Sequence, residues 1–202
     1  MKVSTAAAIV AAVLLFAPQA AFATDQPPSA KAADSPSKGT IVLGMPLIST
    51  TRASVHETLK ASNVPAKRED DRYWYDLYDA SDVLDGADQL SMGYSLRDGR
   101  LGEVRYHFPA FMDPQKVRQI AEMVAEKYGK PNRSSGNVSL GEVEYVWTLP
   151  DGVVLTVSRG WPDTSVSLGY QVPAVFRQMT AEQAENDKAE KESAAKRQSK
   201  NF

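Results

Sequence analysis

Apolar and polar residues alternate with a period of two through much of the middle of this chain. The alternation runs through residues 90–96 and 101–108, and again through 143–149, 153–159 and 164–172. Because successive side chains of a β-strand point to opposite faces, this period predicts strands with one buried face. The apolar positions expected to face a core are Leu90, Met92, Tyr94, Leu96, Val104, Tyr106, Phe108, Tyr145, Trp147, Leu149, Val166, Leu168, Tyr170 and Val172.

The opposite face of these strands is made of small and polar residues. It carries Ser91, Gly93, Ser95, Glu103, Arg105, His107, Thr156, Ser158, Ser165, Ser167, Gly169 and Gln171. An antiparallel sheet commonly packs one face on a core and leaves the other in contact with water. We therefore expect helices on one face of the sheet and an open face of low relief on the other.

Two stretches have a helical period instead. Residues 51–63 place Val55 and Leu59 on one side, and Ser54 and Glu57 have the spacing of a capping box. The second stretch begins at Asp113, which is expected to cap it, and its apolar stripe is Val117, Ile120, Ala121, Val124 and Tyr128. Each helix is expected to cover part of the buried sheet face.

These elements follow one another twice in the same order. A strand over 73–78 and a hairpin turned by Asp98-Gly99 follow the first helix. Strands turned at Pro150-Asp151-Gly152 and at residues 160–163 follow the second helix. The chain therefore predicts an α+β fold of tandem helix–strand–strand–strand units, about 41–109 and 110–175, within one domain of residues 40–176. The two units are expected to form one antiparallel sheet.

Both ends of the chain differ from this domain. Residues 1–23 have a basic start, a short apolar run and a small-residue ending, which together are typical of a secretory signal peptide. Residues 24–39 are rich in Ala, Pro and Ser and predict a flexible leader. Residues 177–202 are rich in Ala, Glu and Lys without an apolar stripe, so a charged helical or disordered tail is expected there.

Composition narrows the function. A formal net charge of −2 offers no basic surface for nucleic acid, so none is expected as a partner. The absence of cysteine excludes a thiolate nucleophile, a zinc–sulfur site and a lipid anchor on cysteine. The apolar run of the signal is too short for a membrane span. These features predict a periplasmic or, alternatively, a secreted protein.

The open sheet face is a candidate docking surface for another protein. If Tyr73, Tyr75 and Leu77 point inward, Trp74 and Tyr78 stand on that face beside three polar residues, Glu103, Arg105 and His107. Trp, Tyr and Arg dominate the energetics of protein interfaces. Two alternatives stay open: the register is shifted and Trp74 is core, or the face is simply solvated.

Evidence for catalysis or a cofactor is weak. The two histidines, His56 and His107, lie in different elements, and no nucleophile motif or glycine-rich phosphate loop is present. One acidic series recurs at every third residue and offers oxygen ligands for calcium, although a solvated loop explains the same residues. Its members are Asp76, Asp79, Asp82, Asp85 and Asp88, with Asp70 and Asp71 upstream. A periplasmic protein that binds a small molecule or calcium with this loop, residues 76–88, is therefore the alternative function. No cofactor is expected, and a hydrolase with an unrecognised site is a further alternative.

Several short motifs of the first unit resemble one family. They are Gly44-Met45, Val55 and Leu59 on the helix, Val64-Pro65, Tyr73-Trp74-Tyr75, Asp98-Gly99-Arg100-Leu101 and Val104-Arg105-Tyr106. With the second unit, residues 41–172 resemble the SmpA/OmlA module and the wider β-lactamase-inhibitor-protein-like (BLIP-like) superfamily. This resemblance implies an envelope protein that binds other proteins, in assembly or inhibition, rather than an enzyme. The SmpA/OmlA proteins are lipoproteins with an N-terminal cysteine, which this chain lacks.

Overall fold

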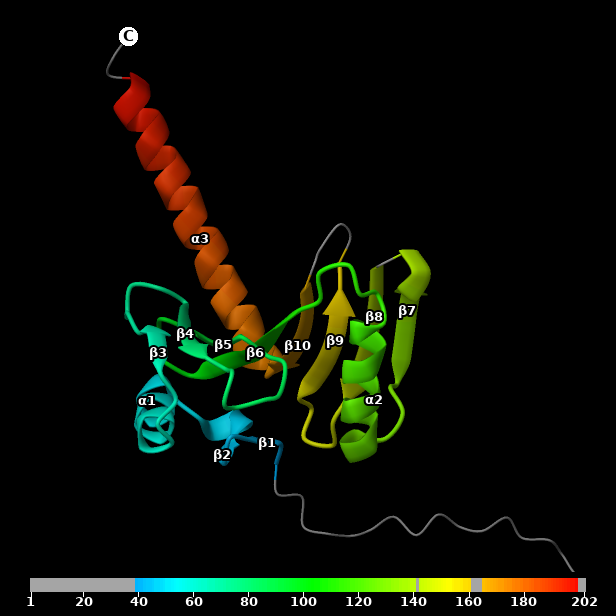
Figure 1. The fold of residues 1–202 in the computed structure, drawn as a ribbon. Helices are drawn as coiled ribbons and strands as arrows, with labels where there is room; N and C mark the ends of the chain where they lie inside the picture. Colours follow the sequence, from blue (N-terminus) through cyan, green and yellow to red (C-terminus); the bar gives the residue numbers. More distant parts are fainter. Residues whose placement is uncertain (1–38, 141, 161–164, 200–202) are drawn as a thin grey trace, which may run out of the picture. The chain divides into compact units, whose positions relative to one another are not determined.

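The computed structural model describes residues 39–140, 142–160 and 165–199. The expected signal peptide, nearly all of the leader, and the turn residue Trp161 lie outside these ranges. Figure 1 shows the elements in chain order. The first unit holds α1 (Arg52–Ala61), β3 (Ala66–Arg68), β4 (Tyr75–Asp79), β5 (Gln89–Tyr94) and β6 (Leu101–Pro109). The second holds α2 (Lys116–Tyr128), β7 (Arg133–Asn137), η2 (Val138–Leu140), β8 (Glu142–Thr148), β9 (Val154–Arg159) and β10 (Ser165–Gln171).

The two units share one antiparallel sheet of eight strands, and the fold is α+β. The strand order is β3-β4-β5-β6-β10-β9-β8-β7, so the last strand of each unit pairs with the other in the centre. Each unit contributes four strands rather than the expected three. The additional strands, β3 and β7, form the two edges of the sheet. Every residue of β7 is exposed and β3 has no buried residue, so neither strand needs the alternating apolar residues that would have predicted it.

The register confirms most of the expected division into faces. Tyr106 lies opposite Leu90 on one side and Leu168 on the other, and Leu168 lies opposite Val157. The side chains on this buried face are part of the hydrophobic core. Leu96 was expected there but is 40 % exposed, because β5 ends at Tyr94 and the register shifts at that end of the strand.

Helix α1 begins one turn earlier than its predicted capping box. Thr51 is the N-cap, and the reciprocal pair is Thr51 with Ser54 rather than Ser54 with Glu57. Val55 and Leu59 are buried, as expected. Before the helix, the hairpin β1 (Ile41–Val42) and β2 (Met45–Pro46) and the 3-10 turn η1 (Leu47–Ser49) contribute further core residues.

Helix α2 begins at Lys116, slightly later than its expected cap. The Asp113 carboxylate still accepts a hydrogen bond from the backbone N–H of Gln115, at 2.8 Å. The predicted stripe is buried from Val117 to Val124. At the other end, the Trp147 indole Nε1 donates to the carbonyl of Gly129 at 2.8 Å and joins α2 to β8.

Helix α3 (Pro173–Gln198) begins directly after β10 with proline in its first turn. The expected tail is thus helical over its described residues, but it is not solvated throughout. Val175, Met179 and Glu182 are buried. The Glu182 carboxylate accepts hydrogen bonds from the Ser95 hydroxyl at 2.7 Å and the Leu96 N–H at 2.8 Å, so packing extends into the tail. Ser95, expected on the open sheet face, is fully buried by these contacts.

Candidate functional site

Glu103 and Arg105 occupy the middle of the open face, on strand β6. Glu103 lies opposite Gly93 of β5 and Gln171 of β10, whereas Arg105 lies opposite Ser91 and Gly169. The small neighbours leave room for long side chains to lie across the sheet. At Gly93 this room is used: a Cβ there would lie 2.6 Å from the ring of Tyr75. Tyr75 therefore crosses β5 to reach Glu103.

Three side chains from three strands converge on the Glu103 carboxylate. The Tyr75 hydroxyl donates to Oε2 at 2.8 Å, and the Gln171 amide donates to Oε1 at 2.9 Å. Arg105 Nη2 donates to both oxygens, at 2.8 and 2.7 Å. Glu103 is only 2 % exposed, so its charge is compensated by hydrogen bonds rather than by water.

Arg105 is held in place while its side chain remains reachable. The side chain is 43 % exposed, and its guanidinium lies 5.9 Å from the centre of the Tyr75 ring. Burial alone would lower the pKa of Arg105, but the neighbouring Glu103 charge outweighs it and raises the pKa. Burial raises the pKa of Tyr75, and the Glu103 charge raises it further. The arginine is therefore cationic and the tyrosine a neutral donor.

His107 extends the polar surface along β6. Its Nδ1 lies 2.5 Å from an oxygen of Asp88, and the two side chains are 40 % and 50 % exposed. His107, Arg105 and Glu103 thus share one face, as the alternation predicted. We call the surface formed by Tyr75, Arg105, His107 and Gln171, together with the buried Glu103 that supports it, the β6 face. Glu103 was expected among the residues that contact a partner, but its burial leaves it a supporting role only.

The predicted aromatic anchors do not lie on this face. Tyr78 is 1 % exposed and pairs with Leu90 on the buried side, so its assignment to a docking surface is wrong. Trp74 precedes β4, and its indole Nε1 is buried without a hydrogen-bond partner among the described residues. The register of β4 is the opposite of the one assumed, and Tyr75 and Leu77 stand on the open face instead.

The reason for this register lies in Asp76. Its carboxylate points to the helix-covered face and is fully buried. Arg52 of α1 donates to both of its oxygens, at 2.9 and 2.5 Å, and His56 Nε2 lies 2.7 Å away. Burial alone would raise the pKa of Asp76, but the hydrogen bonds from Arg52 and His56 outweigh it and lower the pKa. This cluster fixes α1 on β4.

The acidic series does not form a calcium site. Asp76 belongs to the buried cluster, Asp79 accepts hydrogen bonds from Ser81, and Asp88 contacts His107. Across the part of the chain that the structure describes, no group of three or more acidic or histidine residues is arranged to hold a metal ion. The described residues therefore do not support the alternative in which Asp76, Asp79, Asp82, Asp85 and Asp88 bind calcium together.

One exposed apolar feature was missed by the sequence analysis. Phe111 and Met112, between β6 and α2, are 73 % and 89 % exposed. Phe111 has a left-handed backbone with φ of 44°. Arg159 holds this segment, because it donates to the carbonyls of Phe111 and Asp113 at 3.2 and 2.8 Å. Two large apolar residues just before a predicted helix cap were the only available signal.

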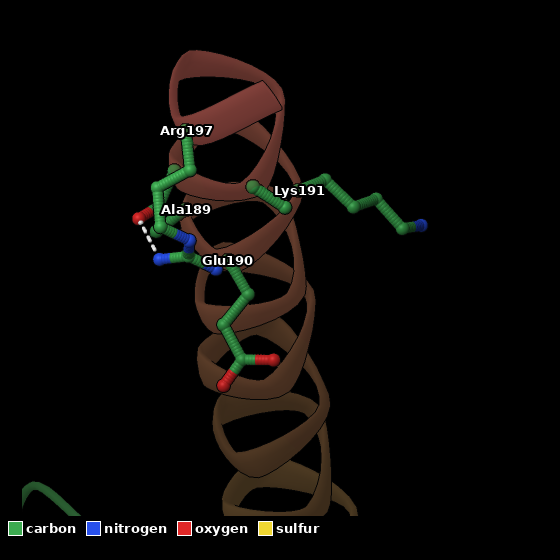
Figure 2. Close-up of a pocket in the computed structure, with 6 residues that line it drawn as sticks. Ala189, Glu190, Lys191 and Arg197 are labelled. Atoms are coloured by element: carbon green, nitrogen blue, oxygen red, sulfur yellow. Dashed lines mark hydrogen bonds between the residues drawn. The ribbon is translucent and has the colours of Figure 1, made fainter. Parts of the chain in front are cut away.

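A shallow hollow on α3 is not a second site. Figure 2 shows that its walls come from side chains of the last turns of that helix, among them Glu190, Lys191 and Arg197. Arg197 donates to the hydroxyl of Ser193 at 2.8 Å, which is a contact within the helix. The lining comes from one helix alone, and nothing in it is buried or fixed from a second element.

Comparison with known proteins gives little guidance. No family model matches the chain, and no curated protein matches it. Among solved structures, a DUF4309 family protein (YjgB) from Bacillus subtilis is similar, with 17 % identity and a TM-score of 0.39. The match covers 66 % of this chain and 88 % of that one. The resemblance to the SmpA/OmlA module stays a prediction.

Among the residues that the structure describes, no helix is both long and apolar enough to cross a bilayer.

Proposed function

We propose that the protein is an exported, non-enzymatic binding module of the cell envelope that docks another protein on its β6 face. The observation that carries this proposal is the state of Arg105. Its guanidinium is fixed by a buried carboxylate, yet almost half of the side chain is exposed. An arginine ordered before binding loses little conformational freedom on association, which favours its use as an interface anchor.

The surroundings of Arg105 suit a flat protein surface. Ser91 and Gly169 flank it, and Ser167 follows on the neighbouring strand, so the residues paired with Arg105 are small. Glu103 uses only Nη2 of Arg105. The remaining N–H groups can donate to a carboxylate or a backbone carbonyl of the partner. The envelope location rests on the signal-like residues 1–23, and the envelope role also agrees with the SmpA/OmlA resemblance.

The test is affinity capture from an envelope extract with the mature protein and two arginine variants. Arg105→Ala removes the proposed anchor. Arg133→Ala is the matched control, because Arg133 lies on the same sheet face, on edge strand β7, with its side chain 69 % exposed. We expect one partner that is retained by the wild type and the control and lost by Arg105→Ala. Equal capture by all three proteins would refute the proposed surface.

A further inference from the structure

A cavity of about 260 Å³ lies on the opposite, helix-covered side of the sheet. Four parts of the chain meet there: the β1–β2 hairpin, the segment between β4 and β5, helix α2 and the central strands β6 and β10. The lining residues are Ile41, Val42, Leu43, Val83, Leu84, Tyr106, Met123, Val124, Lys127, Tyr128, Leu168 and Tyr170. Ile41 and Met123 are 42 % and 39 % exposed, so the cavity reaches the surface between them. For comparison, an apolar cavity of about 150 Å³ takes benzene.

One hydroxyl on the cavity wall has no hydrogen-bond partner among the described residues. Tyr106 is 5 % exposed, yet its hydroxyl makes no hydrogen bond to any residue in the described ranges. Its oxygen is not fully enclosed by protein atoms, unlike that of Tyr94, so it is reachable from the cavity. The hydroxyl can therefore form a hydrogen bond to water or to a polar group of a bound molecule.

A cation stands beside the same cavity. The Lys127 ammonium lies 4.9 Å from the centre of the Tyr128 ring. No carboxylate of the described residues forms an ion pair with it. The Tyr128 ring in turn packs edge-on against Tyr170, with the ring centres 6.4 Å apart. The cavity therefore combines apolar walls, a free hydroxyl donor and an uncompensated positive charge.

The wall also includes a strained residue. Leu43 has φ of 52° and Gly44 has φ of 77°, so both central residues of the β1–β2 turn are left-handed. Glycine or asparagine is the usual choice there, and a leucine costs about 1–2 kcal/mol. Here the leucine side chain packs on the core and closes one side of the cavity.

We propose that this cavity binds a small amphipathic carboxylate, with its apolar part against Leu43, Val124 and Leu168 and its carboxylate near Lys127 and Tyr106. The apolar walls provide the burial, and the two donors select an acid over an uncharged molecule of the same shape. The site lies on the other face of the sheet from Arg105. It is therefore independent of the proposed protein-binding surface, and either can fail without the other.

The probe is octanoate, with 1-octanol as the uncharged molecule of the same chain length. Binding is followed by the methyl resonances of Leu43, Val124 and Leu168 in the full mature protein. We expect octanoate to shift these resonances in a saturable way and octanol to bind roughly tenfold more weakly. No saturable shift with octanoate would overturn the proposal, and equal binding of octanol would overturn the role of the carboxylate.

Two variants distinguish a loss of ligand binding from a loss of protein stability. Tyr106→Phe removes a hydroxyl that has no protein partner, so the melting temperature should stay unchanged while octanoate binding weakens several-fold. Lys127→Gln should weaken binding in the same way, whereas Lys130→Gln, an exposed lysine just beyond α2, should not. Equal binding by Lys127→Gln and Lys130→Gln, or by Tyr106→Phe and the wild type, would contradict the assigned roles.

Discussion

Nη2 of Arg105 contacts both carboxylate oxygens of Glu103, two residues earlier on the same strand, at 2.8 and 2.7 Å. The two side chains share a face of β6, and the buried member fixes the exposed one. Tyr75 and Gln171 complete the shell of Glu103 from neighbouring strands. The exposed Arg105 is thus held by the Glu103 carboxylate, which is too buried to contact a partner directly.

Removing that charge should weaken the fold as well as the surface. Glu103→Ala leaves the Tyr75, Arg105 and Gln171 donors without their acceptor. Because hydrogen bonds to a charged group contribute about 1.5–3 kcal/mol, we expect the free energy of unfolding in urea to fall by about that amount. Glu144→Ala is the control, since Glu144 forms an exposed pair with Arg133. Its cost should stay below about 1 kcal/mol, and equal losses would contradict the account.

Two glycines of the open face should respond in opposite ways to alanine. In Gly93→Ala the new Cβ would meet the Tyr75 ring at 2.6 Å and displace it, which should cost about 1–3 kcal/mol. In Gly169→Ala the nearest atom is Glu103 Oε1 at 3.9 Å, so the variant should be neutral or more stable by about 0.5–1 kcal/mol. Urea unfolding measures both free energies, and a destabilised Gly169→Ala would contradict the open space beside Gly169.

The Asp76 cluster should make stability fall in acid. The folded-state pKa of Asp76 is lowered, so its contribution is complete above the unfolded pKa of about 3.9 and is lost as the pH falls through the folded value. Asp76→Asn should cost about 3–5 kcal/mol at neutral pH, because it leaves Arg52 buried beside an uncharged group. It should also remove part of the decline below about pH 4.

The control for that measurement is Asp82→Asn, which changes an exposed carboxylate in the loop after β4. We expect this variant to keep both the neutral stability and the acid decline of the wild type. A pH profile of urea unfolding that is the same for Asp76→Asn and Asp82→Asn would contradict the role given to Asp76.

Phe111 is strained and exposed, so glycine should relieve the strain at little cost in packing. With φ of 44°, Phe111→Gly should raise the free energy of unfolding by up to about 1 kcal/mol. Phe111→Ala keeps the strain and should give no gain. If Phe111→Gly instead destabilises the protein, the side chain packs against something that its 73 % exposure does not suggest.

The alternation within β6 was enough to predict its faces, because between Glu103 and Phe108 the apolar residues occupy only one parity of the strand. Strand β4 could not be assigned in this way. Residues 73–78 are aromatic or leucine at both parities, and the one polar residue among them, Asp76, is on the buried side. Its partner Arg52 lies 24 residues away in sequence, so no local sequence pattern predicts the ion pair between Arg52 and Asp76.

The edge strands of the sheet and the burial of Glu103 could not be predicted from local sequence patterns either. Strand β7 has no apolar residue, so its strand character comes from pairing with β8. Glu103 was placed on the open face correctly, but its burial comes from Tyr75 and Gln171 on other strands. Tertiary neighbours decide both features, and a single sequence does not show them.

The most direct test of the account is photo-crosslinking from the β6 face in the intact envelope. A photoreactive amino acid at Ser167, which lies opposite His107, is compared with one at Glu126, an exposed residue of α2. We predict one discrete crosslinked protein from position 167, none from position 126, and loss of the product when Arg105→Ala is added. A product from position 126 alone, or one from position 167 that persists in Arg105→Ala, would contradict docking on this face.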